Sequence, residues 1–187
     1  FYGVRIEAAK ALAKTHSPEA LDALIQSLGQ KDARARQDVV QSLAKFYDDK
    51  ALESLKQIVA TEKNPVIASV AIEGLGKFPG AQVAASLSAA LEKPSYRNAL
   101  ASAAIQSIQS QGKAADAKIV LEILQRDKPA FTSRDFGKAL NSLASLVRDE
   151  KPYTDIHQQV RHYLTGHLSD PKRSLRTASI QALATLE

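Results

Sequence analysis

The sequence lacks cysteine, methionine and tryptophan altogether among its 187 residues. Without cysteine the chain can form no disulfide bond, no thiolate metal site and no thiol nucleophile. The sequence therefore does not indicate whether the protein works in an oxidising or a reducing compartment. Without methionine, Phe1 cannot be a native translation start, so we expect the sequence to be a piece of a longer chain.

Long hydrophobic runs are also missing. No apolar stretch approaches the roughly 20 residues that span a bilayer, and the first residues do not resemble a signal peptide. We therefore expect a soluble protein with no membrane partner, its localisation otherwise open. The 25 lysines and arginines exceed the 20 acidic residues, which gives a net charge of +5 with both signs interspersed. This balance permits an acidic partner or nucleic acid without implying either.

Catalytic and cofactor-binding motifs are absent as well. No Gly-x-Ser-x-Gly turn presents a serine nucleophile, and the Gly-Leu-Gly stretch at residues 74–76 follows no strand, so it is not a phosphate-binding loop. His157, His162 and His167 are spaced by five residues. On an α-helix that spacing rotates each ring by about 140° from the last, so the rings cannot converge on one metal ion, and we interpret them as ordinary surface or interface histidines. We predict no catalytic residue, metal or cofactor in this segment.

What the sequence does contain is a repeated helical pattern. Six copies of an 11-residue segment begin 31 to 40 residues apart, at Val4, Ala35, Ile67, Leu100, Asp135 and Leu175. A period of this size is typical of stacked supersecondary units. The sequence therefore predicts a solenoid in which the unit stays constant while the connections lengthen toward the C-terminus.

A second set of apolar segments lies between the copies. In the first of them, Leu21, Leu24, Ile25 and Leu28 are spaced i, i+3, i+4 and i+7, which places them on one face of a helix. Similar segments lie within residues 52–59, 83–91, 119–124 and 156–168. Alternating strand patterns are absent. We therefore predict an all-α fold, an α-solenoid of stacked antiparallel helical hairpins that forms one domain over residues 1–187.

Two positions of the repeated segment carry most of its large apolar side chains. The ninth position holds Leu12, Leu43, Leu75, Ile108, Leu143 and Leu183, and the sixth holds Ala9, Val40, Ile72, Ile105, Leu140 and Ile180. We expect these side chains to form the core between repeats, so that Leu43→Asp or Ile105→Asp unfolds the stack. The fifth position is small except for Val39, as a close approach of helices requires.

Capping residues and prolines mark the expected helix starts. Asn64 and Asp170 each precede a proline, which we interpret as an N-cap followed by a first-turn proline. Thr132 with Asp135 resembles a capping box. All of these residues lie between the apolar segments, so the predicted boundaries agree with the periodicity.

The candidate site residues are polar side chains of the repeated segment. Its eleventh position holds Lys14, Lys45 and Lys77 in the first three copies, and Ser110, Ser145 and Thr185 in the last three. Stacking of the repeats would align the three lysines in a row. Such a row could receive an acidic segment or a peptide carboxylate, or it could only place cations at helix C-termini, where they interact favourably with the helix dipole.

Other polar positions of the same segment are expected to line a concave surface. They are Glu7, Lys10, Asp38, Gln41, Glu73, Gln106, Lys138, Asn141 and Gln181. Their mixed charges suit the docking of a peptide or a protein domain better than a track for phosphates.

Four phenylalanines lie close to these positions in the sequence. Phe46 and Phe78 each follow a lysine of the row, and we expect them to pack between repeats rather than to form a binding pocket. Phe131 and Phe136 flank a long connection, which we predict to be mobile or to face a partner.

Three of the copies carry an arginine at the second position. These are Arg5, Arg36 and Arg176, and aspartates precede two of them, at Asp32 and Asp170. With the small-residue helix that follows, these features resemble the second helix of HEAT repeats. The resemblance implies that both aspartates bond to neighbouring backbone. In the other copies the arginine is replaced by Ala68, Ala101 and Phe136.

A narrower resemblance rests on three stretches. They are FYGVRIEAAKALAK at the start, SPEALDAL from Ser17, and SYRNALASAAIQSI from Ser95 to Ile108. They resemble the C-terminal HEAT region of bacterial zinc metallopeptidases of the aminopeptidase N family. That family holds zinc with a His-Glu-x-x-His helix and a downstream glutamate in a separate catalytic domain, and this motif is absent here. The resemblance implies a non-catalytic accessory domain that shapes the active-site chamber of a zinc aminopeptidase, and it carries over no catalytic residue.

Two other functions stay open. The chain could be a stand-alone scaffold that binds protein partners, or a DNA-binding HEAT-like module such as the alkylpurine glycosylases. The missing tryptophan, the scattered acids and the modest charge count against DNA. The expected partner is therefore a protein or peptide, either the catalytic domain of the same chain or a separate protein.

Overall fold

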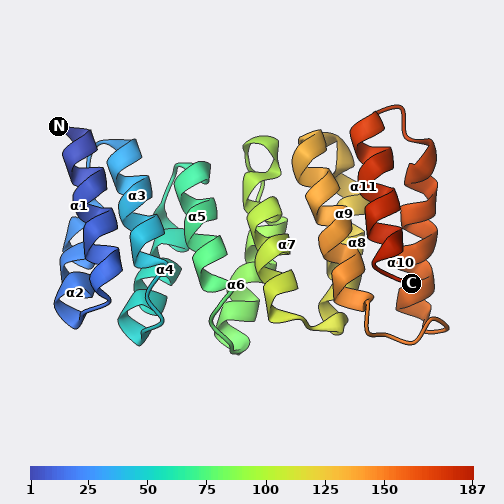
Figure 1. The fold of residues 1–187 in the computed structure, drawn as a ribbon, viewed down its shortest axis with the longest axis horizontal. Coiled ribbons are helices and arrows are strands. Elements are labelled where there is room, and N and C mark those ends of the chain that lie inside the picture. Colours follow the sequence, from blue (N-terminus) through green and yellow to red (C-terminus); the bar gives the residue numbers. More distant parts are fainter.

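All α-helices of the chain belong to one series of antiparallel hairpins (Figure 1). The computed structural model describes residues 1–187 and contains eleven α-helices and no strand. The helices are α1 Tyr2–Thr15, α2 Pro18–Gln26, α3 Ala33–Leu43, α4 Asp49–Thr61, α5 Pro65–Leu75, α6 Ala81–Glu92, α7 Ala99–Gln111, α8 Ala117–Asp127, α9 Ser133–Val147, α10 Asp155–Gly166 and α11 Arg173–Ala184. The predicted all-α solenoid is confirmed.

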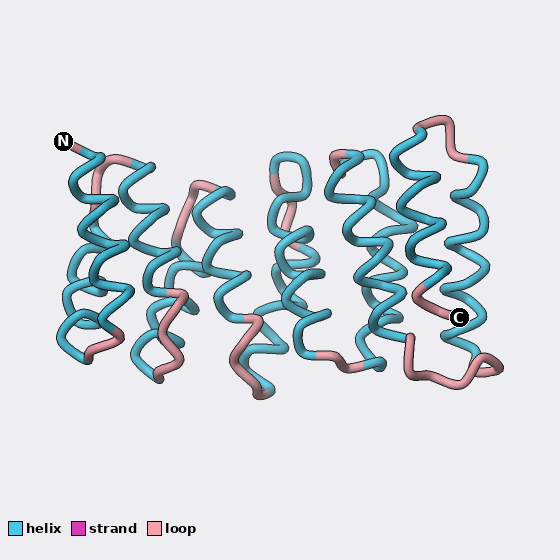
Figure 2. The backbone as a smooth tube through the Cα atoms, in the orientation of Figure 1, coloured by secondary structure: helices cyan, strands magenta, loops and turns pink.

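The helices form two layers. The odd-numbered helices, which are the six repeated segments, form one layer, and the even-numbered helices form the other (Figure 1). The connections are short and alternate between the two ends of the helices (Figure 2), the longest being residues 148–154 between α9 and α10. Successive odd helices contact one another along the whole stack, whereas successive even helices make few contacts. The odd helices therefore pack more closely on one another than the even helices do.

The predicted core positions are buried in the interior of the stack. Both the sixth and the ninth positions of α3, α5, α7 and α9 are buried, among them Ile72 and Ile105. The end helices differ: Ile180 of α11 is 60% exposed, and Leu12 of α1 is partly exposed. The prediction was therefore wrong for Ile180, because α11 has an odd-numbered neighbour on one side only.

Two glycines let α5 approach its neighbours closely. A Cβ on Gly74 would lie 2.8 Å from Cβ of Ala44, and a Cβ on Gly76 would lie 2.9 Å from Cα of Ser107. Both distances are shorter than carbon atoms tolerate, so only glycine fits. Gly74 lies within α5 and Gly76 caps its C-terminus, which agrees with the prediction that this stretch is helical.

The helix starts agree with the capping prediction in two of three places. Asn64 caps α5 by accepting a hydrogen bond from the backbone N–H of Val66 at 3.0 Å. Thr132 caps α9 by accepting from the N–H of Asp135 at 3.1 Å, and its hydroxyl donates to the Asp135 carboxylate at 2.6 Å. Asp170 is the exception, because α11 begins only at Arg173 with Lys172 as its N-cap residue.

The side chain of Asp170 lies one turn before that helix. One of its oxygens accepts from the backbone N–H of Lys172 at 2.9 Å, and the other lies 2.6 Å from Nζ of Lys128. This second contact reaches the connection between α8 and α9. The prediction of an N-cap was therefore wrong, because the carboxylate ties two connections together instead.

The four phenylalanines singled out in the sequence are all buried, whereas Phe1 at the start of the chain is exposed. Phe46 and Phe78 pack between repeats as predicted. Phe131 and Phe136 are also buried, with their ring centroids 5.9 Å apart. The segment between them is a short turn that leads into α9. The predicted long connection is therefore not found between these two rings, because the longest connection of the chain is residues 148–154, after α9. That a long connection is mobile or faces a partner stays a prediction.

Candidate functional site

The predicted site residues lie on the layer of odd helices, and their exposed surface is called the odd-helix face here. Lys10, Lys14, Gln41, Lys45, Glu73, Lys77 and Lys138 are exposed, as are Glu7 and Gln181, while Asp38, Gln106 and Asn141 are half-buried. The seventh and eleventh positions are four residues apart, so they share one side of each helix. Stacking of the helices therefore gathers these side chains on one surface, as the repeat pattern predicts.

The half-buried amides of this face are satisfied within their own helices. Nε2 of Gln106 donates to the carbonyl oxygen of Ser102 at 3.3 Å, and Nδ2 of Asn141 donates to that of Gly137 at 2.9 Å. These two side chains offer a partner less hydrogen-bonding capacity than their residue types suggest.

Charges at the N-terminal end of the face are paired. Nζ of Lys10 lies 3.0 Å from Oε1 of Glu7 and 3.9 Å from Oδ1 of Asp38, the second contact joining α1 to α3. Glu73, farther along the face, has no such ion pair. Although Glu73 is exposed at its surface, partial desolvation of its carboxyl by the surrounding protein raises its pKa above the ordinary value, and the positive charge of Lys138 opposes that rise.

The three lysines of the row have different surroundings. Nζ of Lys77 donates to the carbonyl oxygen of Ala44, the residue that caps the C-terminus of α3, and lies 5.6 Å from the ring centroid of Phe78. Partial desolvation of the Lys77 ammonium by the surrounding protein lowers its pKa. Lys14 and Lys45 are exposed and take no part in the ion pairs of the structure. The interpretation as cations at helix C-termini therefore has a direct contact behind it only for Lys77.

Aromatic rings accompany the row in a repeated arrangement. The ring of His16 packs on Phe46 with centroids 5.6 Å apart, and the ring of Tyr47 stacks on Phe78 at 5.0 Å and within 10° of parallel. Positions can be counted on past the end of the 11-residue segment, starting from its first residue. In both pairs the residue at position thirteen of one repeat covers the residue at position twelve of the next repeat. We call Lys14, His16, Lys45, Phe46, Tyr47, Lys77, Phe78 and Lys113 the lysine–aromatic edge. Sequence reasoning missed the pairing, although the matching register of Lys-Thr-His and Lys-Phe-Tyr could have indicated it.

An open pocket of about 550 Å³ lies at this edge. It is lined by Tyr47, Glu73, Gly76, Lys77, Phe78, Pro79, Ser110, Gln111 and Lys113. Two lysines, one carboxyl group and an exposed ring thus surround one space. This pocket contains two of the predicted site residues, Glu73 and Lys77.

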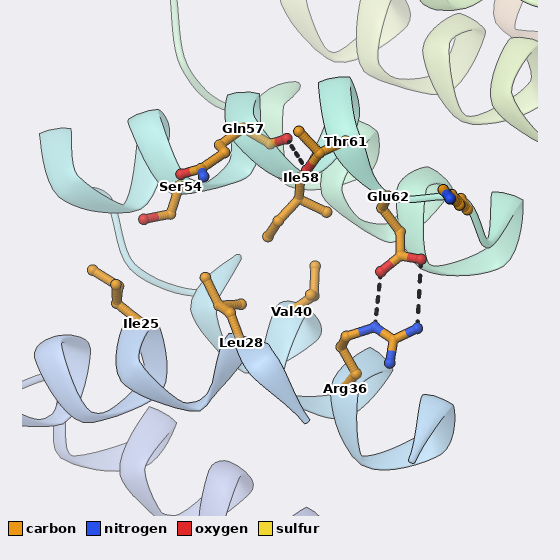
Figure 3. Close-up of a pocket in the computed structure, with 10 residues that line it drawn as sticks. Ile25, Leu28, Arg36, Val40, Ser54, Gln57, Ile58, Thr61 and Glu62 are labelled. Carbon is orange, nitrogen blue, oxygen red and sulfur yellow. Dashed lines mark hydrogen bonds and ion pairs between the residues drawn. The ribbon is translucent and has the colours of Figure 1, made fainter. Parts of the chain in front are cut away.

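A second open pocket, of about 560 Å³, lies on the other layer between α2 and α4 (Figure 3). Ile25, Leu28 and Ile58 provide its apolar walls. At one end Nε of Arg36 donates to Oε2 of Glu62 at 2.8 Å, and this ion pair joins α3 to the end of α4 (Figure 3). Burial alone would raise the pKa of Glu62, but the hydrogen bonds from Arg36 and from the backbone outweigh it and hold the pKa below its ordinary value. Sequence reasoning did not identify this groove.

Asp32 and Asp170 bond to backbone, as the family resemblance implies, and two of the three arginines bond to backbone as well. Oδ1 of Asp32 accepts from the N–H groups of Arg34 and Ala35, at 2.9 and 3.3 Å. Nη1 of Arg36 donates to the carbonyl oxygen of Gln30 at 2.7 Å. Arg176 repeats this contact by donating to the carbonyl oxygen of Asp170 at 2.8 Å. Arg36 and Arg176 therefore each hold the connection that precedes their own helix.

Comparison with protein families gives the same result for the N-terminal part of the chain. The family model of HEAT repeats matches residues 1–76, which comprise α1 to α5. Over these residues the chain is similar to HEAT repeats. The later hairpins continue the same HEAT-like stack in the structure. No curated protein matches the chain, so the narrower resemblance to aminopeptidases has no support beyond the quoted stretches.

Two of the three C-terminal histidines are not surface residues. His157 and His167 are buried, and only His162 is exposed. The ring of His167 packs against Phe136 and Tyr163, with centroids 5.4 and 4.7 Å away. The prediction of ordinary surface histidines was wrong for this pair, because His157 on α10 and His167 in the turn after it are buried within the stack. The alternative of interface histidines agrees with the packing of His167. No group of three histidine, aspartate or glutamate side chains is arranged to hold a metal ion, and no helix is long and apolar enough to cross a membrane.

Proposed function

We propose that this chain is a protein-binding scaffold and that the odd-helix face is its binding surface. HEAT repeats commonly mediate protein interactions, and such a repeat family matches residues 1–76. The observation that carries the proposal is the continuity of the face. Exposed polar side chains recur at fixed positions on successive odd helices, above a layer of buried apolar ones. Solenoids use extended surfaces of this kind to bind partners along several repeats.

The charge pattern of the face favours a protein partner over nucleic acid. Glu7, Asp38 and Glu73 alternate with lysines along the same surface. A carboxylate beside a phosphate would repel it, so a phosphate-binding track requires a more uniformly basic surface. A protein segment with charges of both signs meets no such conflict.

A finer hypothesis makes the partner the catalytic domain of a zinc aminopeptidase. It rests on the resemblance of the three stretches quoted above, and it stays a prediction. The native open reading frame tests it, because the hypothesis requires an upstream His-Glu-x-x-His motif. If the motif is present, deletion of residues 1–187 should change the substrate-size preference of the aminopeptidase. A reading frame without the motif would remove this hypothesis and leave the scaffold proposal intact.

Selection from a random peptide library tests the scaffold proposal. Peptides that bind the 187-residue chain should lose affinity for Lys45→Glu and Glu73→Lys, which change the odd-helix face. Lys118→Glu is the matched control, because Lys118 is an exposed lysine on α8 in the other layer. A library that yields no binder, or binders sensitive only to Lys118→Glu, would contradict the proposal.

A further inference from the structure

We propose that the lysine–aromatic edge binds an extended acidic segment of a protein partner. A carboxylate of that segment enters the pocket beside Tyr47, and a neighbouring apolar or aromatic side chain lies on the outer face of the Tyr47 ring. This inference rests on the proposed scaffold function and names the chemistry of the partner. It concerns the ends of α3, α5 and α7, where the edge and the pocket coincide.

The cationic side chains of the pocket have unused hydrogen-bonding capacity. An ammonium group has three N–H donors, and Lys77 uses one of them on the carbonyl oxygen of Ala44. That bond fixes its position without neutralising its charge. Lys113 is exposed and takes part in none of the ion pairs. Two positive charges thus line one pocket, and no carboxylate is bonded to either.

The aromatic ring of the pocket is exposed yet held in place. Tyr47 is 69% exposed, while Phe78 beneath it is only 5% exposed. The parallel stack at 5.0 Å covers one face of the tyrosine ring and leaves the other open. Because the ring is ordered before a partner arrives, a contact with its open face costs little conformational entropy.

The same arrangement occurs one repeat earlier, which indicates a strip rather than a single pocket. His16 is exposed and packs on the buried Phe46, and Lys14 and Lys45 belong to the same two repeats. An extended segment could therefore place successive acidic and apolar residues on successive repeats. The strip ends at Lys113, since the next helices carry Ser145 and Thr185 in place of lysine.

The acidic groups near the edge favour a protein segment over single-stranded nucleic acid. Glu73 lines the pocket, and Asp48 follows Tyr47 and accepts from the backbone N–H of Lys50 at 2.8 Å. Stacking rings and lysines also suit nucleobases and phosphates. A continuous phosphate backbone would pass these carboxylates, whereas a peptide can place a neutral or basic residue opposite them. Glu73→Gln should accordingly tighten the binding of an acidic peptide.

Fluorescence anisotropy with defined peptides tests the inference. The probe is a fluorescein-labelled peptide of alternating Glu and Tyr, and the comparison peptides alternate Gly with Tyr and Lys with Tyr. We expect only the acidic peptide to bind, with weaker binding at high salt. Tyr47→Ala should weaken binding about three- to tenfold. Lys77→Gln and Lys113→Gln should each weaken it about two- to fivefold.

Matched controls are available for both residue types. Tyr153 is also 69% exposed and lies near a lysine, but in the connection between α9 and α10. Tyr153→Ala and Lys118→Gln should leave binding unchanged. Circular dichroism spectra of all variants establish that they fold.

Three results would overturn the inference. They are equal binding of the Gly–Tyr peptide, indifference of acidic-peptide binding to Tyr47→Ala and the two lysine variants, and Tyr47-dependent binding of oligo(dT) in place of the peptide. If library peptides bind the odd-helix face without acidic residues, this inference fails while the scaffold proposal stands. If no peptide binds that face at all, the scaffold proposal fails as well.

Discussion

The first three and the last three odd helices pack in the same way but present different side chains. In α1, α3 and α5 the eleventh position is lysine, and exposed rings follow it at His16 and Tyr47. In α7, α9 and α11 that position is serine or threonine, and no exposed ring follows. The helix-to-helix contacts tolerate both sets, because they depend on the buried positions. The exposed side chains of one half can therefore differ from those of the other without changing how the helices pack.

The halves also differ in where they place polar groups. The C-terminal half buries His157, His167 and Asp170, whereas the only buried polar side chain of the first three repeats is Ser42. Asp170 bonds across repeats to Lys128. Its N-terminal counterpart Asp32 bonds to residues on its own helix. The N-terminal half thus carries its lysines and aromatic rings on the surface, whereas the C-terminal half buries two histidines and an aspartate.

The largest change in stability is expected when a charged side chain is introduced into the core at α7, where the two halves meet. Ile105 is fully buried in α7, so Ile105→Asp should lower the free energy of unfolding by on the order of 4 kcal/mol or more. Ile180→Asp places the same charge at the same position of α11, which is 60% exposed, and should change stability little. Urea unfolding of both variants checks this. Equal losses would show that the end of the stack is as tightly packed as its middle.

A smaller loss is expected from Asp170→Ala. It removes hydrogen bonds to Lys128 and to the N–H of Lys172, and should cost about 1.5 to 3 kcal/mol. Asp32→Ala should cost less, because the contacts of Asp32 are local and exposed. Urea midpoints at neutral pH compare the two. A greater loss for Asp32→Ala would reverse the contrast between the halves.

The same two aspartates give the chain a predicted pH dependence. The hydrogen bond from Lys128 holds the pKa of Asp170 below its ordinary value, and hydrogen bonds from Arg34 lower the pKa of Asp32 to about 2. A carboxyl group whose pKa is lower in the fold stabilises the fold above its ordinary pKa of about 4. That contribution is lost as the pH falls below this value. The stability difference between the parent chain and Asp170→Ala should therefore shrink from pH 7 to pH 3 in urea titrations, and a difference independent of pH would contradict it.

Close packing should also distinguish the halves. A Cβ on Gly76 would meet Cα of Ser107 at 2.9 Å, whereas the nearest atom to a Cβ on Gly137 would be Cβ of Ala178, at 3.2 Å. Gly76→Ala should therefore cost about 1 to 3 kcal/mol. Gly137→Ala should be near neutral, because better helix propensity offsets the tighter contact. Thermal unfolding measures both, and a neutral Gly76→Ala would mean that α5 and α7 can move apart freely.

The smallest effect on stability is expected from the lysine row itself. Replacing Lys14, Lys45 and Lys77 together by glutamine should lower the free energy of unfolding by no more than about 1 kcal/mol, since only Lys77 bonds a carbonyl oxygen at a helix C-terminus and one such contact is worth about 0.3 to 1 kcal/mol. The same variant should lose the binding of the acidic peptide. A large loss of stability would instead assign the row a structural role. Adding lysine at Ser110 and Ser145 should not extend peptide binding, because no exposed ring accompanies those positions.

The sequence by itself determined the helices, their pairing into hairpins and most of the core. The apolar spacing of α2 and the buried sixth and ninth positions of α3 to α9 follow from local periodicity. The caps at Asn64 and Thr132 follow from hydrogen bonds that span only two or three residues. These features are predictable because each depends on residues that are close together along the chain.

The tertiary structure decided everything that depends on a neighbour one repeat away. The exposure of Ile180, the burial of His157 and His167, and the late start of α11 were all mispredicted from the sequence. The rings at the lysine–aromatic edge pair across about one repeat, and Lys77 bonds to Ala44 across 33 residues. A repeat pattern places such residues near one another, but only the packing of the hairpins sets which atoms meet. The physical reason is that burial and side-chain pairing are set by distances between helices, which local sequence does not encode.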